Sequence, residues 1–101
     1  MNPQQMMQQA RKLQAQLAKI QEELANETVT GSAGSGAVTV TLTGHGSVSK
    51  VHIEKAAVDP EDVETLEDLV MIAFKDAQTK VHELSQSRMG PLAGGLGIPG
   101  F

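Results

Sequence analysis

Apolar residues recur at alternating intervals of four and three along the start of the chain, and this spacing constrains the fold more than any other feature. The stripe consists of Met6, Ala10, Leu13, Leu17, Ile20 and Leu24. Such spacing places all of them on one face of an α-helix. Asn2 can cap that helix and Pro3 suits its first turn. We therefore predict a helix from about Pro3 to Ala25, whose apolar face packs on its own domain or on a partner.

A period of two replaces this pattern after Asn26. Thr28 to Thr30 are β-formers, and a Gly/Ser-rich stretch at 31–36 interrupts them. Val38, Val40 and Leu42 then alternate with threonines, as expected of a half-buried strand. A turn at 44–46 leads into a further strand at 47–54. Because the links between these strands are short, we predict antiparallel hairpins.

Helix signals return at Asp59, which can act as an N-cap with Pro60 at the first helical position. Apolar residues then recur at intervals of three and four up to Leu84. We expect this second helix to end near Arg88 and Met89, where Gly90-Pro91 stops it. The predicted fold is therefore α+β, in the order α-β-β-β-α. Residues 1–89 form one domain, and residues 90–101 form a flexible Gly/Pro-rich tail.

The predicted helices are too long for the predicted sheet to cover. At 1.5 Å per residue they measure roughly 34 and 43 Å, whereas three strands make a sheet only about 14 Å wide. Each helix is tethered to the sheet at one end, so residues 1–15 and roughly 78–88 should project. The projecting ends carry Arg11, Lys12, Lys80, His82 and Arg88.

The charge is distributed unevenly along the chain. The net charge of −4 argues against a general nucleic-acid binder, but residues 1–21 hold three bases and no acid. Residues 54–68 hold seven acids and one base, Lys55. Surface charge acts only within about 10 Å at ordinary salt, so this asymmetry matters more than the total. The sequence predicts basic tips and an acidic waist.

Little in the sequence points to catalysis. The chain has no Cys, which excludes thiolate metal sites and a Cys nucleophile and fits a reducing compartment. His45, His52 and His82 lack the spacing of a helical metal site. The glycines at 31, 34 and 36 lack a phosphate-loop ending and precede a strand. We expect no enzyme activity, no cofactor, no metal, no small-molecule substrate, and neither a signal peptide nor a membrane span.

Several strings in this order resemble the YbaB/EbfC family. They are residues 6–10 (MMQQA), 29–31 (VTG), 36–40 (GAVTV), 51–53 (VHI), 66–70 (LEDLV) and 73–77 (AFKDA). The last two strings are the most specific, and the resemblance covers nearly the whole chain. It implies an α-β-β-β-α homodimer with projecting helical arms that binds duplex DNA in the cytoplasm, at the nucleoid.

The leading hypothesis is a dimer that grips duplex DNA with weak sequence selectivity through its projecting ends. Arg and Lys would neutralise phosphates, and Gln amides could bond phosphates or base edges. The candidate DNA-binding residues are Arg11, Lys12, Lys80, Arg88, Gln4, Gln5, Gln8 and Gln9. Such a protein could organise the chromosome or modulate expression. The alternative is a protein–protein adaptor that uses the same amphipathic helices to hold another helix.

Overall fold

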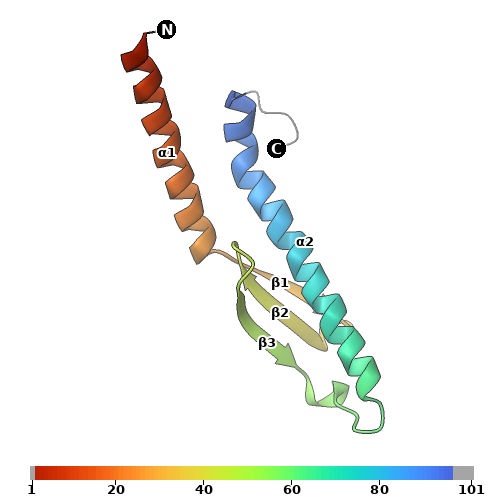
Figure 1. Cartoon of the computed structure of the whole chain (residues 1–101). Coiled ribbons are helices and arrows are strands. Elements are labelled where there is room, and N and C mark those ends of the chain that lie inside the picture. The colour runs from red at the N-terminus through yellow and green to blue at the C-terminus, as the bar shows by residue number, and fades with distance from the viewer. Residues whose placement is uncertain (1, 97–101) are drawn as a thin grey trace.

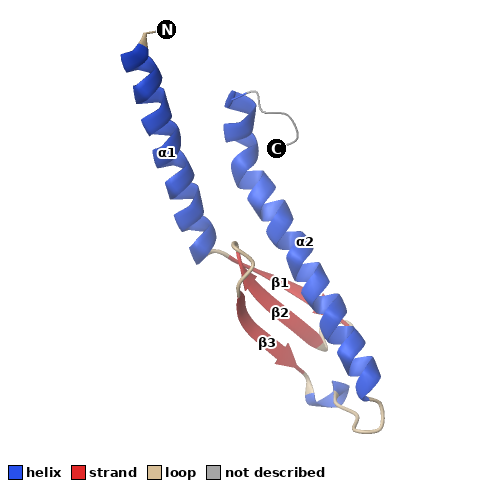
Figure 2. Cartoon of the chain, in the orientation of Figure 1, coloured by secondary structure: helices blue, strands red, loops and turns tan. Residues whose placement is uncertain are grey.

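The computed structural model describes residues 2–96 and confirms the predicted α+β order (Figure 1). Its elements are α1 (Pro3–Asn26), β1 (Thr28–Ala33), β2 (Val38–Thr43), β3 (Val48–Ile53), the 3₁₀ turn η1 (Lys55–Ala57) and α2 (Val63–Leu96). The strands form one antiparallel sheet in the order β1-β2-β3 (Figure 2).

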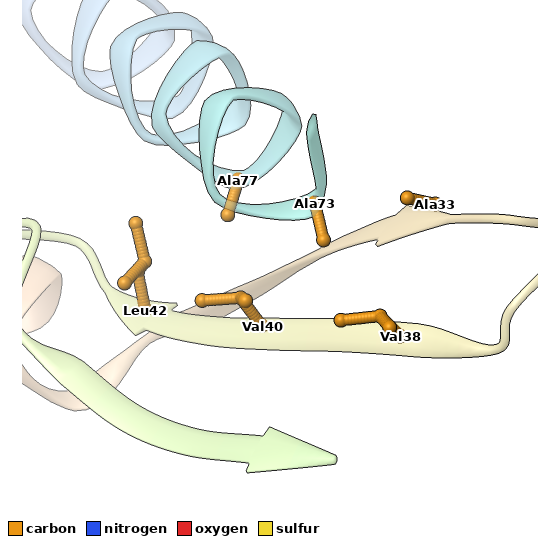
Figure 3. Packing of buried hydrophobic residues seen from close by; sticks show 6 residues of the cluster. All are labelled: Ala33, Val38, Val40, Leu42, Ala73 and Ala77. Carbon is orange, nitrogen blue, oxygen red and sulfur yellow. The ribbon is translucent and has the colours of Figure 1, made fainter. Parts of the chain in front are cut away.

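The core lies between one face of the sheet and α2 (Figure 3). The alternation along β2 buries Val38, Val40 and Leu42 and leaves the intervening threonines half-buried. On α2 the facing residues are Ala73 and Ala77, whose small side chains bring the helix close to the sheet. The core therefore consists of short side chains under one helix, with β2 at its centre.

The free edge of β1 is covered by side chains of α2. The backbone N–H of Ser32 donates to Asp76 Oδ2 at 3.0 Å, and Lys80 Nζ donates to the carbonyl of Thr30 at 2.8 Å. Asp76 and Lys80 also form an ion pair at 3.3 Å. The hydrogen bond from Ser32, followed by that from Lys80, lowers the pKa of Asp76. These contacts satisfy backbone groups that an edge strand otherwise exposes.

Helix α1 begins as predicted and projects beyond the sheet (Figure 1). Asn2 Oδ1 accepts a hydrogen bond from the backbone N–H of Gln5 at 2.8 Å, and Pro3 occupies the first turn. The molecule is elongated, with extents of 70 × 24 × 16 Å. The prediction that both helices outreach the sheet is confirmed.

Three predicted boundaries are wrong. Strand β1 continues through Gly31 to Ala33, because the turn to β2 needs only residues 34–37 and closes with a 3.1 Å hydrogen bond from Ala37 N–H to the Gly34 carbonyl. Asp59 and Pro60 do not start α2. Instead, Asp59 Oδ1 accepts from the Glu61 N–H within a turn, and Asp62 accepts from Thr65 at the real start of the helix.

The third error concerns the end of α2, which passes through Gly90 and Pro91 and reaches Leu96. A proline removes one backbone hydrogen bond and bends a helix, but the chain can resume helical geometry beyond it. The first part of the predicted tail at 90–101 is therefore helical. Residues 97–101 lie outside the described part of the chain, so a flexible end remains a prediction.

Candidate nucleic-acid interface

The exposed N-terminal part of α1, residues 3–21, carries positive charge and no acid; we call it the N-terminal arm. Arg11, Lys12 and Lys19 are exposed, and none forms an ion pair within residues 2–96. A helical period of 3.6 places all three on the side opposite the apolar stripe. Lys19 was not among the predicted contacts, although its spacing of seven residues from Lys12 could have revealed it. The arm therefore presents three available cations along one side.

Glutamines surround these cations. Gln5, Gln8, Gln9 and Lys12 line a shallow hollow on the arm, and Gln4 is exposed beside it. The side chain of Gln5 also helps to cap α1, because its oxygen accepts a hydrogen bond from the Asn2 N–H at 3.4 Å. The other glutamine amides make no hydrogen bond within residues 2–96. Amides beside cations are suited to contact phosphates and base edges.

Lys80 and Arg88, also predicted as DNA contacts, are engaged within the chain. Lys80 bonds Asp76 and the Thr30 carbonyl at the edge of β1. Arg88 Nη1 bonds Glu23 Oε2 at 3.0 Å, and Arg88 Nη2 bonds Glu27 Oε1. Both cations would have to leave these partners, or share them, to reach a phosphate. The structure thus separates the predicted cations into an available pair on α1 and an engaged pair on α2.

The base of α1 is fixed to the turn between β2 and β3. The N–H of Gly44 donates to the carbonyl of Leu24 at 2.9 Å, and His45 Nε2 lies 2.8 Å from the Gln21 carbonyl. Leu24 is only 3% exposed. A Cβ on Gly44 would lie within 3.0 Å of the Leu24 backbone, so a glycine is needed for this close approach. His45 is exposed and helps to hold the last turns of α1.

An apolar groove runs between β3 and α2, on the side where α2 leaves the sheet uncovered. Its apolar lining comprises Ile53, Leu66, Val70, Met71 and Phe74. Val51 and Ile53 face the same side of the sheet as their neighbours on β2, the buried Val40 and Val38. Val51 is nevertheless 50% exposed and Met71 55% exposed. Exposed apolar surface of this kind is a candidate interaction site.

Residues 2–96 contain no group of three or more His, Cys, Asp or Glu side chains that could hold a metal ion. Over the same residues, neither α1 nor α2 is long and apolar enough to cross a membrane. Within the described residues, the arm and the groove are surface features that call for a functional explanation.

Comparisons with known proteins agree with this geometry. A nucleoid-associated protein of Roseiflexus sp. (strain RS-1) is 52% identical over 101 residues, covering 100% of both chains. One from Corynebacterium glutamicum (strain R) is 52% identical over 92% of this chain and 90% of its own length. An uncharacterized protein of Helicobacter pylori shares the fold, with a TM-score of 0.80 and 21% identity over 91% of this chain and 97% of that one.

The family model of the YbaB/EbfC DNA-binding family matches residues 1–96, which is almost the whole chain. This match includes both helices and the sheet between them. Together with relatives at about half identity over at least 90% of their length, it shows that the chain belongs to the YbaB/EbfC DNA-binding family.

Proposed function

We propose that this protein binds duplex DNA through the N-terminal arms of a homodimer, with weak sequence selectivity. The observation that carries the proposal is the acid-free arm on which Arg11, Lys12 and Lys19 are exposed without ion-pair partners. These cations would neutralise phosphates, and Gln4, Gln5, Gln8 and Gln9 would add hydrogen bonds. Lys80 and Arg88 contact DNA only if they give up or share their partners within the chain. The protein then acts without catalysis, a cofactor or a small-molecule substrate.

The uneven charge explains how an acidic chain can bind DNA. The acids concentrate at residues 54–68, at the opposite end of the molecule from the tip of the arm (Figure 1). Charges separated by several Debye lengths of about 8–10 Å are screened from one another. Few cations per subunit imply moderate, salt-sensitive affinity that depends on two arms acting together.

A second copy of this chain is the occupant that best fits the apolar groove. The edge of β1 is closed by Asp76 and Lys80, whereas β3 is an exposed edge strand beside the groove. Exposed apolar surface next to an open strand edge suits a permanent partner. The same surface on both copies gives a closed two-fold dimer.

The charges on α2 support an antiparallel arrangement of the two copies. Glu67, Met71 and Lys75 are spaced by four residues, so they follow one face of α2, and all three line the groove. If two α2 helices cross antiparallel about Met71, Glu67 of each copy meets Lys75 of the other. A parallel crossing would instead oppose like charges. Two arms would then project from one dimer body.

The relatives are named nucleoid-associated proteins, and this supports a place at the nucleoid, in the cytoplasm. Weakly selective duplex binding by a dimer is suited to organising the chromosome or modulating expression over many sites. These cellular roles follow from the proposed DNA contact and depend on it.

The first experiment is fluorescence anisotropy of a labelled random duplex, titrated with protein at several salt concentrations. Binding should weaken as salt rises, and the slope of log K against log salt should be about −0.9 per phosphate contacted. Replacing Arg11 and Lys12 together by Gln should weaken binding. It should also make the slope shallower, by about 0.9 for each phosphate that the variant no longer neutralises.

The matched control is the double variant Lys50→Gln, Lys55→Gln, which removes the same charge away from the arm. Both lysines are exposed and unpaired within residues 2–96. If the control loses as much affinity as the arm variant, net charge rather than the arm governs binding. Absence of any binding at low salt would overturn the proposed function.

A further inference from the structure

Arg88 links α2 to the base of α1, where the two helices make few other contacts. Its guanidinium bonds Glu23 through Nη1 at 3.0 Å and Glu27 through Nη2. We call these three residues the clasp. Arg88 lies on α2, and Glu23 and Glu27 lie at the C-terminal end of α1, more than 60 residues away along the chain. The clasp thus ties the base of the arm to the long helix.

The clasp uses the particular geometry of arginine. Two different guanidinium nitrogens reach two different carboxylates. The planar fork of arginine holds these donors at a fixed spacing, whereas a lysine would have to bring both carboxylates to one nitrogen. All three side chains are only 35–40% exposed. Glu27 Oε2 is buried without a hydrogen-bond partner. Removing Arg88 would leave this carboxylate without its charged partner.

The rest of α1 gives the arm little lateral support. Leu24 is the only buried residue of α1 among residues 2–26, and most of the arm is exposed. The base is otherwise held by the contacts of Gly44 and His45 with the Leu24 and Gln21 carbonyls. Those bonds join the base of α1 to the turn between β2 and β3, whereas the clasp joins it to α2. Apart from the half-buried Leu13, Leu17 and Ile20 on its apolar stripe, the arm thus depends on the clasp for its direction relative to α2.

A small change at the base moves the arm cations far. Arg11 lies about 18 Å along the helix from Glu23, at 1.5 Å per residue, so a tilt of about 10° displaces it by about 3 Å. That displacement is as large as a hydrogen-bond length of about 2.9 Å. Two arms that must reach one duplex together are sensitive to such shifts, because both must be correctly spaced to bind at once.

We propose that Arg88 is a positioning residue for DNA binding: through Glu23 and Glu27 it sets the direction of the arm, and it does not itself contact DNA. This inference rests on the proposed function. It replaces the direct phosphate contact expected from the sequence with an indirect role, and the two roles predict opposite effects when the clasp acids are neutralised.

The deciding variant is the double substitution Glu23→Gln, Glu27→Gln, assayed as the full chain on the labelled random duplex. If Arg88 contacts phosphate, freeing it and removing two negative charges strengthens binding. If the clasp positions the arm, binding weakens about two- to tenfold, which is the lower part of the range spanned by coupling between neighbouring groups. The matched control is Glu22→Gln, Glu83→Gln, which removes two exposed acids that are unpaired within residues 2–96.

Arg88→Lys gives a second test, because it keeps the charge and removes the fork. A phosphate contact survives this change, whereas the clasp loses the two separate nitrogens that hold Glu23 and Glu27 in their present positions. We expect Arg88→Lys to weaken DNA binding as the double Gln variant does, with the salt slope unchanged. Tighter binding by the Glu23→Gln, Glu27→Gln protein than by its control would overturn the proposal, as would normal binding by Arg88→Lys.

A distance measurement tests the clasp without DNA. The chain has no native cysteine, so spin labels at Met7→Cys on α1 and Gln86→Cys on α2 report the separation of the helices directly. Labelled protein is diluted with unlabelled protein to isolate distances within one chain. The distribution should be narrow in the parent and broaden or shift in both clasp variants. An unchanged distribution overturns the clasp even if the protein binds DNA, and lack of DNA binding with a broadened distribution would refute only the DNA role.

Discussion

Gly31 of β1 lies directly against the backbone of Ala77 on α2. A Cβ added to Gly31 would lie within 3.0 Å of the Ala77 nitrogen and of the Ala73 carbonyl oxygen. Helix and strand thus approach each other through backbone atoms, and no flexible side chain can move aside. Ala73 and Ala77 are fully buried at the same contact, so this point sets the separation between α2 and the sheet.

Replacing Gly31 by Ala should therefore destabilise the protein by about 1–3 kcal/mol, the usual cost of overpacking a core. Urea unfolding followed by circular dichroism would measure the free energy of unfolding. Gly90→Ala is the matched control, because Gly90 is helical and has nothing within 4 Å of an added Cβ. That control should change the free energy of unfolding little, because the gain in helix propensity is offset by the restriction that Pro91 places on a preceding residue with a Cβ. A neutral Gly31→Ala would contradict the close contact.

The stability of the protein should depend on pH through Asp76, whose pKa is lowered by the Ser32 N–H and by Lys80. A lowered folded-state pKa contributes stability above the unfolded value, which is about 3.9 for Asp. As the pH falls below that value the unfolded chain takes up the proton first, so this contribution is lost as the pH passes through the folded pKa. Asp76→Asn should be less stable than the parent at pH 7, and the difference should shrink on acidification.

The measurement is the free energy of unfolding from pH 7 down to the acid limit of the folded state. Asp68→Asn is the control, since Asp68 is an exposed carboxylate on the same helix without a hydrogen bond within residues 2–96. Because Asp76 also shares a half-exposed ion pair with Lys80, the effect should weaken at high salt. A difference that grows at low pH would show that the sign is wrong.

Among the apolar residues of α1, Leu24 should be the one whose truncation to Ala costs the most stability. It is 3% exposed and lies where Gly44 meets the helix, so Leu24→Ala should cost about 2–5 kcal/mol of stability. Leu13→Ala, at a half-buried position further along the same stripe, should cost clearly less. Thermal unfolding of the two variants side by side makes the comparison. Equal losses would mean that the arm is packed along its length, contrary to the exposure of its side chains.

Periodic segments were predictable from the sequence, and local turn chemistry was less so. The alternation at Val38, Val40 and Leu42 and the stripe on α1 each repeat over several residues, so one reading of the pattern dominates. Asp59-Pro60 is a strong helix start in isolation, but the chain uses it in a turn and begins α2 at Val63. Gly31 looked like part of a loop, although it serves a close contact inside a strand.

Some features of the candidate site were likewise predictable from the sequence, and others were not. Exposure of Arg11 and Lys12 follows from their position opposite the apolar stripe, which the sequence displays. Lys80 pairs with Asp76 at a spacing of four, which the sequence displays. Its contact with Thr30 and that of Arg88 with Glu23 span 50 and 65 residues, and no periodicity reveals such contacts. Charge alone therefore could not distinguish a cation available to DNA from one that holds two elements together.

The groove between β3 and α2 yields the last prediction, that Met71→Glu separates the proposed dimer. In an antiparallel pair Met71 lies at the crossing, so two introduced carboxylates would face each other in an apolar contact, at high cost. Light scattering after size exclusion should show the mass falling from two chains to one. Ile72→Glu is the control, because Ile72 is 54% exposed, next to Met71 at 55%, and does not line the groove.

Exchanging the charges of Glu67 and Lys75 tests the orientation of the two copies. Glu67→Lys should weaken the dimer by opposing Lys75 of the other copy, and adding Lys75→Glu should restore it. If the exchanged pair does not recover, the antiparallel arrangement is wrong, and a single-chain mass for the parent would reject the dimer itself.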